Sequence, residues 1–286
     1  ILEKSAKAEV TYVTPNKEGI VAVKDIEKAI RPNTILVSVM YVNNEIGTVQ
    51  SIVEIGKMLE KYPKIFFHTD ATQAINYFNC NVKKLGVDLL SMSGHKIYGP
   101  KGIGVLYIKK GTPIARLQDG GGQEFGKRAG THNVPGIVGI GAALTIIKSS
   151  KIQKQIKKLR DYLINRVLKE IPESRLNGSK KLRSPNNANF TFPRVEGESL
   201  IMLLDMDGIA CSTGSACSSG NLEPSHVLMS LGMKAEDAHG SVRMTLGKST
   251  TKKDIDYTIA KLKNSIKKVR KVSGNVLEDY YKSKKL

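Results

Sequence analysis

The stretch TILVSVMYVNNEIGTVQSIVEIGKMLEKYPKIFFHTD, residues 34–70, decides the fold class of this chain. Its first part, residues 34–40, is mostly apolar and β-branched, which is typical of a buried parallel strand. Apolar residues then recur at helical spacing over residues 51–62, and a second strand-like run covers residues 65–68. A strand, a helix and a strand in close succession predict a βαβ unit, and therefore an α/β fold with a mostly parallel sheet.

Outside this stretch the pattern predicts two domains. Further strands are predicted at residues 87–92, 105–108, 187–192 and 242–246, and helices at residues 137–148, 152–167 and 255–269. The last helix begins with Thr251 and Asp254 at the spacing of a capping box. Since long amphipathic helices and a smaller mixed sheet replace the βαβ pattern, we predict a large domain at 1–147 and a smaller α+β domain at 148–286.

Composition excludes several classes of protein. The 286 residues are 40% hydrophobic and 25% charged, which is ordinary globular usage, and no apolar run approaches the ~20 residues of a membrane span. The net charge of +19 comes from lysines spread along predicted helices, so we expect no nucleic-acid partner. The start of the chain lacks the pattern of a signal peptide, and three cysteines without a CxxC pair predict neither a disulfide framework nor a protein-only zinc site. We expect a cytoplasmic protein without membrane partners.

Polar clusters follow several of the predicted strands, where α/β sheets bind ligands. They lie at residues 43–47, 70–73, 93–96, 120–131 and 215–217. Each alone has an ordinary structural explanation, such as a helix cap or a solvated surface. Together they fit pyridoxal 5'-phosphate (PLP), which needs a lysine amine, a carboxylate for its pyridine nitrogen and donors for its phosphate. Lys96 and Asp70 follow separate strands and are the candidates for the amine and the carboxylate.

Five motifs resemble those of the NifS/IscS-type cysteine desulfurases. They are VNNEIGTVQ (42–50), HTDATQA (68–74), SGHKIYGPKGIG (93–104), GGGQEFGKRAGTHN (120–133) and GSACSSGNLEPSHVL (214–228). The short segment around Cys217 is similar to the group I enzymes. The resemblance implies a PLP-dependent enzyme of fold type I, with its cofactor in the large domain and the cysteine in the small one. Such an enzyme converts L-cysteine to L-alanine and supplies sulfur for iron–sulfur clusters and other thio-cofactors.

The resemblance also implies a role for each matching residue. Lys96 would bind the cofactor covalently and move the substrate's α-proton. The other cofactor residues would be Asp70 at the pyridine nitrogen, Asn44 and Gln73 at the phenolic oxygen, Ser93, Gly94 and His95 at the phosphate, and Thr131 at the phosphate of the partner subunit. The last role requires a homodimer. For the substrate, Arg243 would bind the carboxylate, since a guanidinium matches its planar geometry, and Asn44 would lie beside it.

Cys217 resembles the nucleophile that takes the sulfur as a persulfide. Cys211 follows an apolar pair outside the matching motif, so we expect it to be structural, and Cys80 has no catalytic context. We expect no resident metal, with Cys217 serving at most as a transient iron–sulfur ligand. The partners implied are a second copy of the chain and an iron–sulfur scaffold or another sulfur-acceptor protein.

The first residues resemble a point about a hundred residues into the family's sequence. We therefore expect a fragment, one half of a split protein or an incompletely described chain, whose activity requires the missing N-terminal segment. A non-enzymatic subunit that relays sulfur is one alternative, and another fold type I enzyme such as a selenocysteine lyase or an aminotransferase is the other. Only the desulfurase and the relay need Cys217 in its motif.

Overall fold

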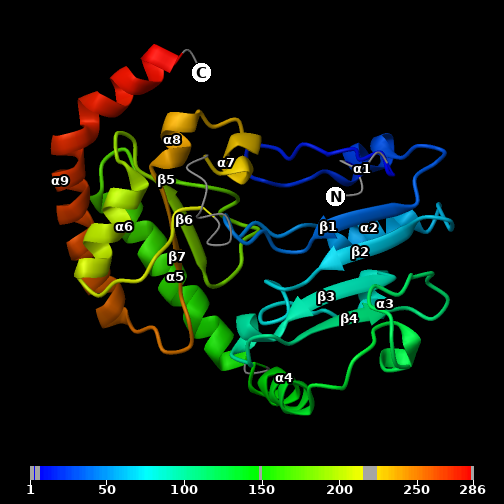
Figure 1. Ribbon diagram of the computed structural model, residues 1–286. Coiled ribbons are helices and arrows are strands. Elements are labelled where there is room, and N and C mark those ends of the chain that lie inside the picture. The colour runs from blue at the N-terminus through cyan, green and yellow to red at the C-terminus, as the bar shows by residue number, and fades with distance from the viewer. Residues whose placement is uncertain (1–2, 4–6, 148–149, 215–223, 285–286) are drawn as a thin grey trace. The chain divides into compact units, whose positions relative to one another are not determined.

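The computed structural model describes residues 3, 7–147, 150–214 and 224–284 (Figure 1). The chain forms two compact units. The first, which we call the parallel-sheet unit, comprises residues 30–42 and 50–149. The second, the antiparallel-sheet unit, comprises residues 1–29, 43–49 and 150–286.

The parallel-sheet unit contains four strands in the order in which they occur in the chain. They are β1 (Leu36–Met40), β2 (Phe66–Asp70), β3 (Leu89–Ser93) and β4 (Gly104–Ile108). The pairs β1–β2 and β2–β3 are parallel and β3–β4 is antiparallel, so the predicted, mostly parallel sheet is confirmed. The helical elements are α2 (Ile52–Leu59), α3 (Val82–Leu85), η1 (Gly94–Ile97), η2 (Glu124–Gly126) and α4 (Val134–Ile146).

Apolar side chains at helical spacing hold α2 and α4 in this unit. Ile52, Ile55, Met58 and Leu59 of α2 are all buried, as their spacing predicts. Gly56 lets α2 approach α3 closely, because a Cβ there would lie 2.4 Å from the carbonyl oxygen of Leu85. Ile140 and Ala143 of α4 and its C-cap residue Ile147 pack against η1 and β3 in a cluster with Met92 and Ile97. This cluster fixes the segment that follows β3.

The antiparallel-sheet unit contains a three-stranded sheet and most of the helices. Its strands are β5 (Arg175–Leu176), β6 (Asn187–Thr191) and β7 (Ser241–Thr245), in that order and all antiparallel. Its helices are α1 (Val23–Ala29), α5 (Ser150–Glu170), α6 (Gly197–Met206), α7 (His226–Ser230), α8 (Ala235–His239) and α9 (Lys252–Lys284). The predicted capping box at the start of α9 is present, since Thr251 N donates to Asp254 Oδ2 at 2.8 Å and Asp254 N donates to Thr251 Oγ1 at 3.2 Å. None of the described helices is both long enough and apolar enough to cross a membrane.

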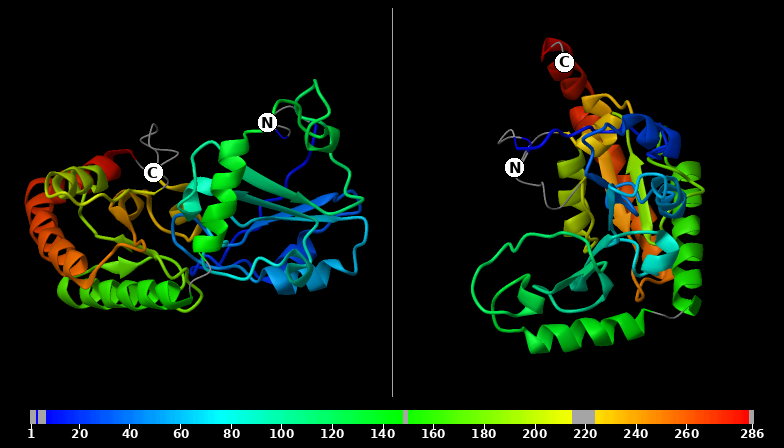
Figure 2. Two further views of the ribbon diagram at one scale, coloured as in Figure 1. Left: turned by 90° about the horizontal axis from the view of Figure 1, so that it is seen from below. Right: turned by 90° about the vertical axis from the view of Figure 1, so that its right-hand side faces the viewer.

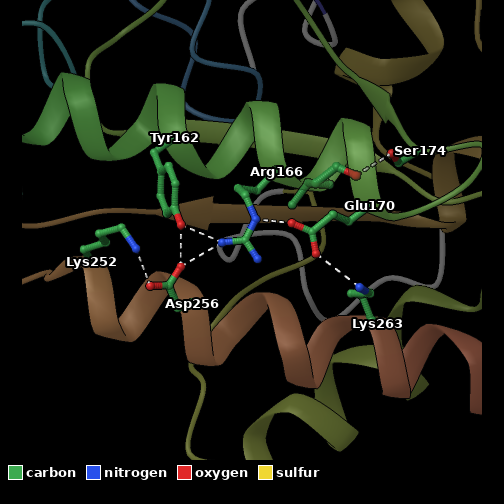
Figure 3. Close-up of polar contacts among 8 residues, drawn as sticks. Tyr162, Arg166, Glu170, Ser174, Lys252, Asp256 and Lys263 are labelled. Carbon is green, nitrogen blue, oxygen red and sulfur yellow. Dashed lines mark hydrogen bonds and ion pairs between the residues drawn. The ribbon is translucent and has the colours of Figure 1, made fainter.

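The long helices α5 and α9, which can be followed in Figure 2, contact each other and are joined by ion pairs. Figure 3 shows Arg166 of α5 between Glu170 of its own helix and Asp256 of α9, with an Nη1–Oδ1 distance of 2.8 Å to Asp256. Lys252 and Lys263 complete the network on Asp256 and Glu170. Hydrogen bonds from the cations hold the pKa values of Glu170 and Asp256 at about 2.

The two units are not separated at a single point along the chain. One change of unit falls between residues 149 and 150, whereas residues 1–29 and 43–49 belong with the second half. Hydrogen bonds explain this grouping, because Thr48 Oγ1 donates to Glu18 O at 2.8 Å and accepts from Ser179 N at 3.0 Å. The predicted domain boundary at residue 147 lies close to the change of unit after residue 149, and the division into domains at 1–147 and 148–286 stays a prediction.

Candidate active site

The carboxyl ends of β2 and β3 bring several of the predicted residues to one edge of the parallel sheet. Asp70 ends β2, is half-buried, and accepts a hydrogen bond from Thr72 N at 2.8 Å. It lies opposite Ser91 of β3, and the next residue donates from Ala71 N to Ser91 O at 2.9 Å. Gln73 is half-buried in the turns that directly follow. Asp70 therefore lies beside the strand that leads to Lys96.

Lys96 lies in η1, directly after β3, and its side chain belongs to an exposed residue. Ser93, the last residue of β3, shares a 2.7 Å hydrogen bond with His95 Nδ1. Gly94 is buried, and a Cβ there would lie 2.9 Å from Ile103 Cγ2, so only glycine fits without a shift. The turn thus places the hydroxyl of Ser93, the imidazole of His95 and the amine of Lys96 beside the end of β2.

His68 is a further polar residue of this sheet. Its Nδ1 lies 2.8 Å from Ser38 Oγ of β1, and its Nε2 lies 3.3 Å from Ser91 Oγ of β3. Burial lowers the pKa of His68, while the charge of Asp70 opposes that shift. Because residues 68 and 70 lie on the same face of β2, the imidazole of His68 flanks Asp70. Its hydrogen bonds to β1 and β3 make it a support for the end of β2.

Thr131 lies in the same unit, in the exposed segment between η2 and α4. The backbone before it is unusual, since Glu124 and Phe125 have φ angles of 50° and 55°. Phe125 is 96% exposed among the described residues. Thr131 is exposed as well, on the surface of the parallel-sheet unit.

Arg243 and Asn44 belong to the antiparallel-sheet unit. Arg243 is half-buried in the middle of β7, and its Nη1 donates to the carbonyl oxygen of Asn44 at 2.8 Å. The backbone of Arg243 also forms a bridge with Ser212, in which Arg243 N donates to Ser212 O at 2.6 Å. The two predicted substrate residues are thus in contact, and Arg243 reaches within a few residues of the motif that contains Cys217.

Three residues that no sequence motif indicates hold the Asn44 segment in place. Asn187 and Asn189 of β6 donate from Nδ2 to the carbonyl oxygen of Glu45, at 3.0 and 3.1 Å. Arg183 contacts one of them, since it donates to Asn187 Oδ1 at 3.1 Å. Burial lowers the pKa of Arg183 to about 9. The sequence shows a polar run at residues 177–187 that is typical of a linker, whereas the structure buries much of it. The asparagines at the two ends of that run, Asn177 and Asn187, were the feature of the sequence that could have indicated its burial.

The structure describes two of the three cysteines, Cys80 and Cys211. Cys217 lies outside the described residues, as does most of its motif. Cys211 and Cys80 are half-buried, and burial raises the pKa of each thiol to about 11. Both remain protonated near neutral pH, as is typical of buried cysteines that do not react. Among the described parts of the chain, no group of histidine, cysteine and acidic side chains could hold a metal ion.

Comparison with known proteins gives consistent matches over most of the chain. Residues 1–258 match the family model described as Aminotransferase class-V. A "Cysteine desulfurase IscS" from Dictyoglomus turgidum is 52% identical over 267 residues, which cover 93% of this chain and 68% of the relative. Another from Clostridium botulinum is 51% identical over 279 residues, covering 96% of this chain and 70% of the relative.

Solved structures give the same result. A NifS-like protein superposes with a TM-score of 0.84 at 35% identity, over 92% of this chain and 70% of that one. A NifS-like protein from Rickettsia africae superposes with a TM-score of 0.85 at 31% identity, over 93% and 72%.

Proposed function

The chain belongs to the aminotransferase class-V family, and from this we propose that it is a PLP-dependent cysteine desulfurase, which converts L-cysteine to L-alanine. The observation that carries the proposal is the pairing of β2 with β3, since it sets Asp70 beside the strand that leads to Lys96. Identity of about half the residues to IscS enzymes supports the same activity.

The residues at this edge of the sheet fit PLP by their chemistry. A half-buried carboxylate at the end of β2 suits the protonated pyridine nitrogen, and the amine of Lys96 suits the aldehyde. Ser93 and His95 would supply donors for a phosphate, with Gly94 beside them in the turn, its own N–H donating to Ile103 O at 2.9 Å. Bound there, PLP would withdraw electrons from the substrate's α-carbon.

Each remaining role falls to a side chain of this protein. Lys96 Nζ takes the α-proton of the substrate and returns it. With PLP bound, Asn44 and Gln73 would donate to its phenolic oxygen, and Arg243 would bind the substrate carboxylate. Asn44 is held for this by the hydrogen bond from Arg243 to its carbonyl oxygen.

Cys217 accepts the sulfur. Its thiolate attacks the sulfur of the substrate, a sulfur–sulfur bond forms, and the carbon–sulfur bond breaks. The electron pair of that bond stays with the substrate carbon, which takes a proton and becomes the methyl group of alanine. Cysteine and the enzyme thiol thus give alanine and an enzyme persulfide, with no external oxidant or reductant.

The protein works as a homodimer that passes sulfur to an acceptor protein, with an iron–sulfur scaffold as the main candidate. The exposed position of Thr131 supports its role at the phosphate of a second copy. Three cysteines without a disulfide framework support a cytoplasmic location. Light scattering tests the dimer, and a stable monomer that binds PLP with normal affinity contradicts it.

Peptide mapping after borohydride reduction tests the cofactor site. We expect the reduced cofactor on Lys96, with its near neighbour Lys101 unlabelled. A label on any other lysine contradicts the assignment.

The nucleophile is tested by comparing Cys217→Ser with Cys211→Ser. We expect Cys217→Ser to keep the visible absorbance of the cofactor but to form neither alanine nor a protein persulfide, while Cys211→Ser does both. A persulfide located by mass spectrometry in Cys217→Ser would contradict a role for Cys217. If Cys217→Ser still releases sulfur from cysteine without forming a persulfide, the result would point to another fold type I activity.

A further inference from the structure

Glu45 is a buried acidic residue to which the proposed reaction assigns no role. It is 1% exposed, and its polar contact among the described residues is a hydroxyl group rather than a cation. A buried carboxylate is costly unless its surroundings compensate for it. Its contacts therefore indicate what it does.

The carboxylate of Glu45 lies where two separate parts of the chain meet. Ser225 Oγ donates to Glu45 Oε2 at 2.5 Å. Gly214 approaches the same oxygen, because a Cβ on Gly214 would lie 3.3 Å from Glu45 Oε2 and 3.3 Å from Ser225 Cβ. Gly214 and Ser225 are the residues on either side of positions 215–224, which include Cys217. Glu45 thus accepts a hydrogen bond at one end of the segment that contains the nucleophile and lies close to the other end.

The backbone at Glu45 is held independently of its carboxylate. Its carbonyl oxygen accepts hydrogen bonds from Asn187 and Asn189, and the preceding carbonyl accepts one from Arg243. On the other side, Ile46 packs in a buried cluster with Leu228, Leu231 and Ala238. The side chain of Glu45 can therefore be shortened while Asn44 keeps these backbone contacts.

We propose that Glu45 is a positioning residue for Cys217. Its carboxylate holds Ser225 beside Gly214 and so fixes where the nucleophile's segment begins and ends. The inference rests on the proposed function, since it takes Cys217 as the sulfur acceptor. Glu45 acts on the sulfur-transfer step and leaves α-proton removal by Lys96 unchanged.

The test compares two reactions in the purified protein reconstituted with PLP. Formation of the persulfide and alanine from L-cysteine in the first turnover needs Cys217. Exchange of the α-proton of L-alanine in D₂O, followed by NMR, needs Lys96 and the cofactor but no nucleophile. A residue that merely supports the fold would affect both reactions.

Glu45→Ala is expected to slow sulfur transfer by roughly tenfold to a hundredfold, the cost typical of a misplaced reacting group. Its α-proton exchange and its KM for cysteine should stay within about threefold of the parent values, since the contacts of Asn44 are kept. Glu45→Gln, which keeps an acceptor for the Ser225 hydroxyl, should recover most of the rate. Ser225→Ala should reproduce the loss and Ser225→Thr should not.

Sulfur transfer at the parent rate in Glu45→Ala would overturn the proposal. So would equal loss of both reactions in Glu45→Ala and Ser225→Ala, because Glu45 would then support the cofactor site or the fold. Cys217→Ser, measured in parallel, separates this inference from the function beneath it. If Cys217→Ser still desulfurates cysteine, the assignment of the nucleophile fails, whereas a dead Cys217→Ser beside a fully active Glu45→Ala removes only the role of Glu45.

Discussion

Cys80 and Cys211 should react slowly with disulfide reagents in the folded protein. Burial raises both pKa values to about 11, from an ordinary value of 9.0. At about pH 8 the thiolate fraction then falls roughly a hundredfold, from about a tenth to about a thousandth. The more basic thiolate is about six- to tenfold more nucleophilic, so the net expectation is about tenfold slower reaction before limited access adds to it.

The assay uses Cys217→Ser, in which Cys80 and Cys211 are the remaining thiols. Its reaction with 5,5'-dithiobis(2-nitrobenzoate) is followed in buffer and in denaturing guanidinium chloride. We expect the folded protein to react at least about tenfold more slowly than the unfolded one. Adding Cys80→Ser assigns the rates to single thiols. Equal rates in the two states would refute the reasoning, because neither thiol would then be shielded by the fold.

Three further predictions concern stability. Phe190→Ala, at a fully buried position of β6, should lower the free energy of unfolding by about 3–5 kcal/mol in urea titrations, and a loss below about 1 kcal/mol would contradict its place in the core. Thr251→Ala removes the cap of α9 and should cost about 0.5–2 kcal/mol, with Thr251→Ser as the matched control that keeps it. Stability should also fall at both extremes of pH. Because the pKa values of Glu170 and Asp256 are lowered in the folded protein, these carboxylates stabilise the fold above about pH 4, and this contribution is lost as the pH falls towards 2. Because the pKa values of the Cys80 and Cys211 thiols are raised in the folded protein, their contribution is present below pH 9 and is lost as the pH rises towards 11. A urea midpoint that stays constant over both ranges would contradict these signs.

The parallel-sheet unit could be predicted from the sequence because its signals are local. Each strand is a short apolar run, and α2 shows its buried face directly in the spacing of Ile52, Ile55 and Leu59. The polar residues that end those strands, Asp70 and Ser93, follow from the same reasoning, since parallel strands end at one edge of a sheet.

The antiparallel-sheet unit was harder to predict because long-range contacts decide it. The run at residues 177–187 is polar and turn-like by composition, yet Asn177 and Arg183 are buried because they hydrogen-bond to the backbone and to β6. Glu45 is similar, since a glutamate in a polar motif predicts a solvated position. Its burial depends on partners from residues far along the chain, which no local pattern reveals.

The grouping of residues 43–49 with the second half of the chain sets an order for folding during synthesis. The hydrogen bond from Asn189 to Glu45 spans 144 residues, so its donor is made long after its acceptor. At about 5–20 residues per second, the acceptor segment waits roughly 7–30 s on the ribosome for its partners. Ile46 would be exposed to solvent or to chaperones throughout that time, because the helix it packs against is made still later. Folding of the parallel-sheet unit can precede this step, and the segment containing Asn44 is completed only when the later parts of the antiparallel-sheet unit have been made.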